Sequence, residues 1–146
     1  MSDDNRHRDI RDFDEFPLHK ALGVKLLDVT AGSARCVLET TPMTASGVGG
    51  GVHGGVLAAV LDMVMLEAVI PMIGPGEQPA GTADLNITYM RPALGARIYA
   101  EATVIKKGRA LAVIEVAITD ERGRLCAKGR TLYAIRQIPG AAGQRP

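Results

Sequence analysis

One acidic residue stands inside an almost wholly apolar segment of this 146-residue chain. Residues 56–70 read VLAAVLDMVMLEAVI, and their only charged members are Asp62 and Glu67. An ionised carboxylate is costly to bury without a partner, so Asp62 needs an explanation. It is either an exposed acid on a helix edge or a carboxylate kept in a cleft as a general base or nucleophile. The apolar neighbours favour the second interpretation for Asp62, whereas we expect Glu67 to be solvated.

The segment before this run, GVGGGVHGG at residues 47–55, is rich in glycine and holds one histidine, His53. N–H groups at the start of a helix have no partner within it, and the helix dipole adds positive potential there. Gly54 and Gly55 would therefore offer donors to a substrate carbonyl and could stabilise an oxyanion. The alternative is a flexible loop that uses glycine for unusual dihedral angles. A lone histidine here is typical of a capping or loop-bracing residue.

Two other kinds of site find little support. Gly49, Gly51 and Gly54 match the GxGxxG pattern of dinucleotide-binding proteins. That pattern needs a strand leading into the loop and a βαβ unit, whereas strand-like segments follow one another here. Neither Cys36 nor Cys126 has a second Cys or a His at metal-ligand spacing. We therefore expect no metal site and two reduced thiols.

Composition limits the partners of the chain. A formal net charge of +1 gives no sign of binding to nucleic acid or to an anionic membrane. With no Trp, two Phe and three Tyr, the chain has few aromatic rings on which bases could stack. The N-terminus has no apolar stretch of the signal-peptide type, and residues 56–70 are too short and too charged to span a bilayer. We expect a cytoplasmic protein.

The segments around the apolar run predict one α+β domain over residues 13–136, with flexible tails at residues 1–12 and 137–146. A short helix is expected within residues 13–22, ended by Gly23, and a long helix at residues 56–70. Strands are expected at residues 24–30, 33–41, 82–90, 97–107, 109–120 and 124–136. Successive hairpins favour an antiparallel sheet with the helix against it. Because the helix has no polar face, either the sheet wraps it or a second subunit covers the rest.

Three segments together resemble a known family. GVHGGVLAAVLD at residues 51–62 is followed by TADLNITYMRPA at residues 82–93 and KKGRALAVIEVAITDERGRLCAKGRTLY at residues 106–133. The combination resembles hotdog-fold acyl-CoA thioesterases of the phenylacetate-pathway (PaaI-like) type and their thioesterase superfamily member 2 relatives, over about residues 21–135. The resemblance implies a central helix wrapped by a curved antiparallel sheet of about six strands.

The same resemblance implies an assembly and a reaction. Two subunits pair edge to edge, dimers often pair again into a homotetramer, and each active site lies between two subunits. Asp62 would be the catalytic carboxylate, which activates water or attacks the thioester. The Gly54 N–H would polarise the thioester carbonyl, while His53 braces the loop and Thr82 helps to orient the water. Gly54 would come from one subunit and Asp62 from its partner, although the two lie about 12 Å apart along one helix.

Contacts to the substrate are also implied. No cofactor is needed, because CoA is part of the substrate. The candidates for CoA contacts are Gly55, Arg91, Lys107, Gly108, Arg109 and Arg130. The acyl pocket is expected to include Met63 and Leu66, with Met90 nearby, and these residue types do not specify the acyl group.

One position departs from the family pattern. Gly47 stands where these thioesterases have an Asn that helps to hold the water or the acid, although Gly50 keeps the middle glycine. The hydroxyl of Ser46 or Thr44 could substitute for it. Two functions follow: hydrolysis of an acyl-CoA, or a hotdog protein that binds acyl-CoA or another apolar ligand without cutting it. A hotdog hydratase is a third class, but its usual motifs are absent.

Overall fold

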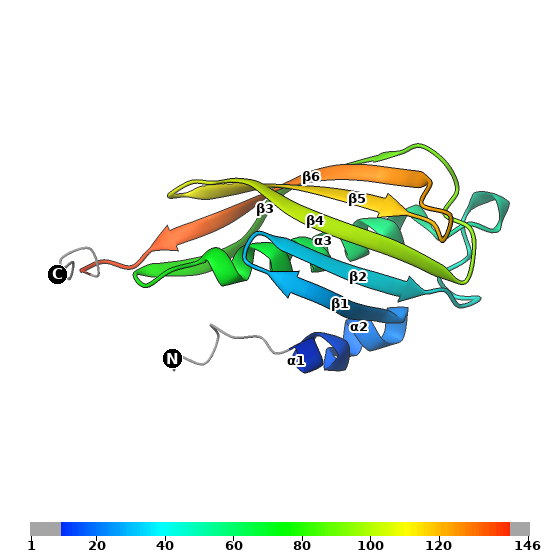
Figure 1. The fold of residues 1–146 in the computed structure, drawn as a ribbon, viewed down its shortest axis with the longest axis horizontal. Helices are drawn as coiled ribbons and strands as arrows, with labels where there is room; N and C mark the ends of the chain where they lie inside the picture. The colour runs from blue at the N-terminus through cyan, green and yellow to red at the C-terminus, as the bar shows by residue number, and fades with distance from the viewer. Residues whose placement is uncertain (1–9, 141–146) are drawn as a thin grey trace.

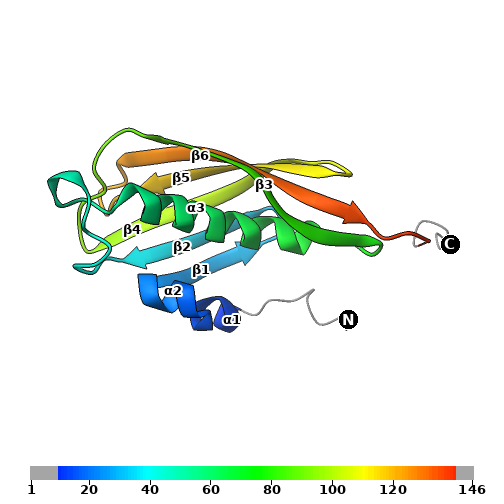
Figure 2. The same cartoon turned by 180° about the vertical axis from the view of Figure 1, so that it is seen from behind.

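Six antiparallel strands form one sheet around a single long helix in the computed structural model, which describes residues 10–140 (Figure 1). The strand order is β1-β2-β4-β5-β6-β3, so β1 and β3 are the two edges. Seen from behind, the helix runs along one face of the sheet (Figure 2). The predicted hotdog fold is confirmed. The elements are α1 (Ile10–Glu15), α2 (Pro17–Leu22), β1 (Val24–Thr30), β2 (Ser33–Glu39), the 3-10 turn η2 (Val48–Gly50), α3 (Gly54–Val69), the 3-10 turn η3 (Ile70–Met72), β3 (Glu77–Tyr89), β4 (Arg97–Lys107), β5 (Leu111–Thr119) and β6 (Leu125–Gln137).

The N-terminal helix predicted within residues 13–22 is in fact two short helices, α1 and α2. The break falls at Phe16, whose backbone is extended with ψ of 132°. Pro17 follows it, and a proline disfavours helical backbone at the residue before it. Gly23 ends α2 as predicted, in the left-handed conformation with φ of 82° that glycine adopts without steric cost.

Both stretches predicted to be flexible tails include residues of regular secondary structure. α1 begins at Ile10, inside the stretch expected to be a flexible tail, and residues 1–9 lie outside the described part of the chain. Gln137, assigned to the C-terminal tail, belongs to β6. Its side-chain amide donates to the backbone oxygen of Arg109 at 2.8 Å, which fastens the end of β6 to the β4–β5 turn. Residues 141–146 are likewise outside the described part.

The edge strand β3 begins at Glu77, five residues before the strand predicted to start at Thr82. Pro79 and Gly81 sit in the loop-like sequence that hid this half of the strand. The register with β6 shifts between Pro79 and Gly81 and again between Thr82 and Asp84. Such bulges let a strand pass a proline and change the face to which its side chains point.

Helix α3 supplies most of the core. It packs against every strand of the sheet, most extensively against β4, β2 and β5. Its buried residues are Leu57, Val60, Leu61, Met63, Val64, Met65, Glu67, Ala68 and Val69. Together with η3 it has the length and apolar composition of a membrane span, contrary to our expectation. Half of that stretch is nevertheless buried inside this chain, as in the core helix of a sheet.

Glu67 corrects one expectation. The residue is only 3% exposed, so the prediction of a solvated acid is wrong. The side of α3 that carries Glu67 faces the sheet near Cys36 on β2. Burial raises the pKa of the Cys36 thiol to about 12, and the negative charge of Glu67 adds to that rise. The sheet therefore covers almost all of the helix beyond Leu66.

A close approach sets the distance between α3 and β6. A Cβ at Gly129 would collide with the side chain of Leu61 and lie 2.5 Å from the Asn86 carbonyl oxygen. Only glycine leaves this room, so Leu61 can rest directly on the strand.

The two edges of the sheet differ in how they are covered. Along β1, the helices α1 and α2 lie beside the strand (Figure 1), and the Asp14 carboxylate accepts a hydrogen bond from the Leu26 N–H at 2.8 Å. Beyond β3, no element follows within residues 10–140. Next to β3, the partly exposed side chains of Val56, Ala59, Asp62 and Leu66 form a stripe along α3. The described chain therefore leaves one side of its helix and one edge of its sheet open.

Candidate active site

Asp62 and Thr82 meet on the open side of α3. The Thr82 hydroxyl donates to Asp62 Oδ1 at 2.7 Å. In a regular strand, Thr82 would share its face with Asp84 and Asn86, which point away from the helix. The bulge between Thr82 and Asp84 reverses this, because Thr82 then pairs with the buried Tyr133 and shares the face of Ile87. Helix α3 and strand β3 thus bring together two side chains that are twenty residues apart in the sequence.

His53 caps the helix that carries the acid. Its Nδ1 accepts a hydrogen bond from the Gly55 N–H at 2.9 Å and so satisfies a donor in the first turn of α3. Since Nδ1 is the acceptor, the ring proton of neutral His53 lies on Nε2. Of the two N–H donors expected to be open, that of Gly55 is therefore taken. The Gly54 N–H has no acceptor among the described residues, so it is the donor left for a carbonyl.

Tyr89 is a neighbour of this donor that the sequence reasoning missed. From the end of β3, its hydroxyl donates to the Gly54 carbonyl oxygen at 2.5 Å. A Cβ on residue 54 would lie 3.2 Å from the Tyr89 ring, so the ring occupies the space that a side chain would need. The signal was available: Ile87 and Tyr89 are two residues apart and share the face that looks toward α3.

The loop before the helix is folded so that residue 47 can have no side chain. The Gly47 N–H donates to the Gly51 oxygen at 2.8 Å, and a Cβ on residue 47 would lie 2.7 Å from that same oxygen. The Ser46 hydroxyl donates to the Met43 oxygen at 3.0 Å, and the buried Thr44 bonds to Thr41. Both hydroxyls thus bond within the loop.

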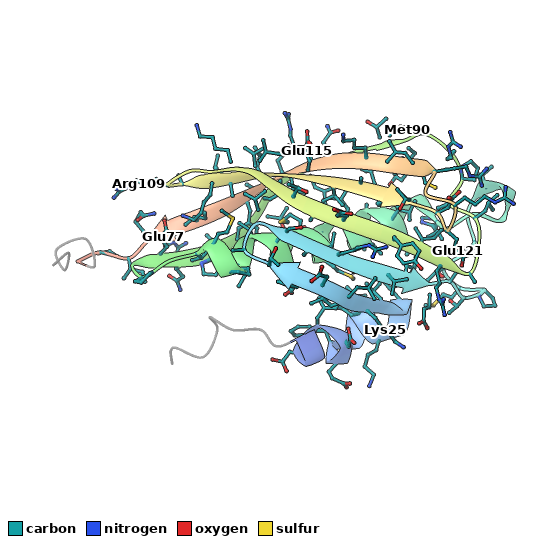
Figure 3. All side chains as sticks on the ribbon, in the orientation of Figure 1. Lys25, Glu77, Met90, Arg109, Glu115 and Glu121 are labelled. Atoms are coloured by element: carbon teal, nitrogen blue, oxygen red, sulfur yellow. The ribbon has the colours of Figure 1, made fainter. Side chains whose placement is uncertain are left out.

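The basic candidates for CoA do not converge within one chain. Lys107 forms an ion pair with Glu77 at 2.8 Å, and Arg109 lies at that same end of the sheet (Figure 3). Met90 follows β3 at the other end of the sheet, where Figure 3 labels it, and Arg91 is the next residue in the sequence. The exposed Arg130 alternates along β6 with buried residues, so it points away from α3.

The Glu77–Lys107 pair is held on several sides. Glu77 also accepts hydrogen bonds from the Gly74 N–H at 3.0 Å and from the Gln137 amide at 3.5 Å. Burial raises the pKa of Glu77, but these bonds and the positive charge of Lys107 outweigh it and hold that pKa below its ordinary value. The pair anchors the turn that contains Gly108 and Arg109 to the start of β3.

Of the expected acyl-pocket residues, only Leu66 shares the open side of α3 with Asp62. It lies one helical turn further along and is partly exposed. Met63 is buried in the core, and Met90 lies at the other end of the sheet, 49% exposed. Leu66 is therefore the expected pocket residue that lies on the same side of α3 as Asp62.

Comparisons with curated proteins find a match over part of the chain. Acyl-coenzyme A thioesterase 13 from Homo sapiens is 46% identical over 54 residues, which are 36% of this chain and 39% of that protein. The protein from Mus musculus is 43% identical over the same length. The match thus spans about two fifths of the curated relatives.

Solved structures match over most of the chain. A mutant of phenylacetic acid degradation protein PaaI from Thermus thermophilus has a TM-score of 0.71 and 29% identity, covering 82% of this chain and 98% of that one. Zebra fish thioesterase superfamily member 2 has a TM-score of 0.69 and 28% identity, covering 86% and 91%. The BH2602 protein from Bacillus halodurans, solved with CoA, has a TM-score of 0.64 and 26% identity, covering 70% and 66%.

A family model agrees with these likenesses. The model described as the thioesterase superfamily matches residues 49–127, more than half of the chain. The matched stretch includes Gly54, Asp62 and Thr82. The chain therefore belongs to the thioesterase superfamily.

Proposed function

We propose that this protein is an acyl-CoA thioesterase, which hydrolyses the thioester of an aromatic or fatty acyl-CoA to the free acid and CoA. The observation that supports this most directly is the hydrogen bond from Thr82 to Asp62 on the open side of α3. It holds one carboxylate oxygen in place, while Oδ2 accepts no hydrogen bond among residues 10–140. An oriented carboxylate with one free oxygen suits a general base.

In the proposed reaction, Asp62 Oδ2 takes a proton from a water molecule as the water oxygen attacks the thioester carbon. The Gly54 N–H donates to the carbonyl oxygen as that oxygen becomes negative, helped by the positive end of the helix dipole. The carbon–sulfur bond then breaks, and the proton passes from Asp62 to the departing CoA thiolate. Direct attack by Asp62 on the thioester carbon is the alternative, with water cleaving the resulting anhydride.

The reaction needs two chains. Asp62 lies eight residues after Gly54, about 12 Å along the helix, too far for both to touch one thioester. We therefore propose a homodimer in which Gly54 of one subunit faces Asp62 of the other. The open edge of β3 supports this arrangement, since its register with β6 is regular from Asp84 to Tyr89. A further pairing of dimers into a tetramer, and a cytoplasmic location, remain predictions.

The proposed binding site for CoA follows from the same pairing. Arg91 lies at one end of each sheet and Arg109 at the other, so two antiparallel subunits could bring residues from both ends toward one nucleotide. The BH2602 protein, solved with CoA, supports the choice of ligand. Met63 is buried, so Leu66 is the stronger candidate for contact with the acyl group.

The experiment is to measure CoA release from acyl-CoAs with phenylacetyl, benzoyl, short fatty and long fatty groups. Wild type, Asp62→Asn and Asp28→Asn are compared, because Asp28 is an exposed acid on β1, the opposite edge of the sheet. We expect turnover with wild type and Asp28→Asn and almost none with Asp62→Asn at an unchanged melting temperature. Full turnover by Asp62→Asn would refute the proposed role of Asp62.

A second function is favoured by the glycine loop. Gly47 lacks the side chain that holds water or acid in the relatives that the chain resembles, and the loop leaves no room for one. A protein built this way could bind acyl-CoA without cutting it. Calorimetry that shows tight binding of an acyl-CoA that wild type never hydrolyses would support this binder over the enzyme.

A further inference from the structure

Two side chains hold the peptide group that follows Gly54. The Tyr89 hydroxyl donates to the carbonyl oxygen of this group, and His53 Nδ1 accepts from its N–H at residue 55. One partner comes from β3, thirty-five residues further along the chain, and the other from the N-cap of α3. The plane of this peptide group is therefore fixed from both sides.

The peptide group before Gly54 is fixed as well. Its carbonyl oxygen, that of His53, accepts from the N–H groups of Val56 and Leu57 at 2.9 and 3.1 Å. The N–H of this same group is the open Gly54 donor. Hydrogen bonds therefore hold the peptide groups on both sides of Gly54, although glycine is by itself the most flexible residue.

Tyr89 also occupies the space beside Gly54. The hydroxyl end of its ring lies 3.2 Å from where a Cβ of residue 54 would be, so Gly54 packs closely against this side chain. Tyr89 is 49% exposed within the single chain, so packing inside the chain covers only about half of it. The hydroxyl bond to the Gly54 oxygen adds a directional constraint.

We propose that Tyr89 is a positioning residue that aims the Gly54 N–H at the thioester carbonyl, an inference that rests on the proposed function. A donor stabilises a developing oxyanion best when its direction is set before the reaction. Tyr89 acts through Gly54 and takes no part in proton transfer. Loss of the Tyr89 hydroxyl therefore weakens the stabilisation of the transition state and leaves substrate binding nearly unchanged.

The test compares Tyr89→Phe with Tyr99→Phe. The first keeps the ring beside Gly54 and removes only the hydroxyl. The second makes the same change on β4, where the Tyr99 ring lies 4.9 Å from the Arg35 guanidinium, far from the site. We expect Tyr89→Phe to lower kcat about three- to tenfold with KM within twofold, since one neutral hydrogen bond is lost. Tyr99→Phe should retain wild-type kcat, and both melting temperatures should stay near that of wild type.

A second measurement reads the geometry without turnover. In protein labelled with ¹⁵N-glycine, loss of one of the 17 glycine resonances in Gly54→Ala assigns the Gly54 amide. Tyr89→Phe should shift that resonance and speed its exchange with solvent, whereas Tyr99→Phe should not. An unmoved Gly54 resonance, or an unchanged kcat in an active protein, overturns the positioning role. If wild type hydrolyses no acyl-CoA while Tyr89→Phe still shifts the resonance, the proposed function is refuted. The structural role of Tyr89 beside Gly54 is then still supported.

Discussion

Thr82 reaches from the edge strand β3 to Asp62 on the central helix, with its hydroxyl 2.7 Å from the carboxylate. The contact exists because the β-bulge at Thr82 turns this side chain toward α3. Among residues 10–140 it is the only hydrogen bond that joins the sheet to Asp62, so its removal tests whether the orientation of the carboxylate matters.

Replacing Thr82 by Val keeps the shape of the side chain and removes the hydroxyl. We expect kcat to fall roughly 10- to 100-fold, since hydrogen bonds to charged groups are the stronger class. Thr82→Ser retains the donor and should keep most of the activity. The measurement is kcat for the preferred acyl-CoA, with melting temperature as the folding control. Equal kcat for Val and Ser would show that the hydroxyl does not serve the reaction.

Restoring the family residue at position 47 should not improve this protein. A side chain there would press on the backbone oxygens of Gly51 and Val52, at 2.7 and 2.9 Å from its Cβ. We expect Gly47→Asn to lower the free energy of unfolding by about 1–3 kcal/mol, as overpacking does, and not to raise kcat. Gly49→Asn is the control, because its φ of 69° suits Asn and its Cβ would meet nothing within 4 Å. A faster and equally stable Gly47→Asn would contradict the loop geometry.

A site shared by two chains can be rebuilt from two defective ones. Asp62→Asn and Gly54→Ala should each be nearly inactive alone. Their heterodimer, isolated with two different tags, holds one site with both residues intact, so about half of the wild-type activity is expected. The matched control pairs Asp62→Asn with Thr82→Val, whose lesions fall in the same half of the site in each chain. Restoration in the control, or none in the first pair, would rule out the proposed arrangement.

The Glu77–Lys107 pair should make stability depend on pH. Because the folded-state pKa of Glu77 lies below the ordinary value of 4.5, its stabilisation is complete above that value and is lost as the pH falls below it. Glu77→Gln should lower the melting temperature at pH 7 and flatten its fall between about pH 5 and pH 3. Glu101→Gln, an exposed acid with no ion pair among the described residues, should behave as wild type. Parallel curves for Glu77→Gln and wild type would exclude this role.

Both cysteines should be inert in the folded protein. Burial raises the pKa of Cys36 to about 12, and burial together with the negative charge of Asp120 raises that of Cys126. The thiolate is the reactive form, so a chromogenic disulfide reagent at about pH 8 should find almost no thiol in native protein and two per chain in denaturant. CoA release can then be followed with the same reagent. A thiol that reacts within minutes in native protein would contradict this prediction.

Much of the fold was readable from the sequence, because hydrophobic periodicity and glycine turns report local structure directly. The strands 24–30 and 97–107 match β1 and β4 residue for residue. The first half of β3 was missed since Pro79 and Gly81 look like loop, and only pairing with β6 makes them strand. Glu67 was misplaced for a similar reason: the side of α3 on which it lies is decided by how the sheet curves.

The candidate site likewise contains residues that the sequence indicates and contacts that only the structure shows. Asp62, Gly54 and His53 stand out by residue type and spacing, and the structure gives each a defined place. The bond from Tyr89 to Gly54 joins residues thirty-five positions apart, so alternation along β3 indicates the face on which Tyr89 lies but not the residue to which it bonds. The closed loop at Gly47 is likewise a matter of backbone geometry, invisible until the oxygen of Gly51 is in place.

The open edge of β3 affects how the chain folds and assembles. Bulges and Pro79 shield its first half, but from Asp84 to Tyr89 its backbone groups face outward in regular register. In the proposed dimer a second copy covers this edge, and before that pairing the unpaired strand of another chain can bind to it instead. We expect refolding yield to pass through a maximum with concentration: too little protein delays pairing, and too much favours aggregates over dimers.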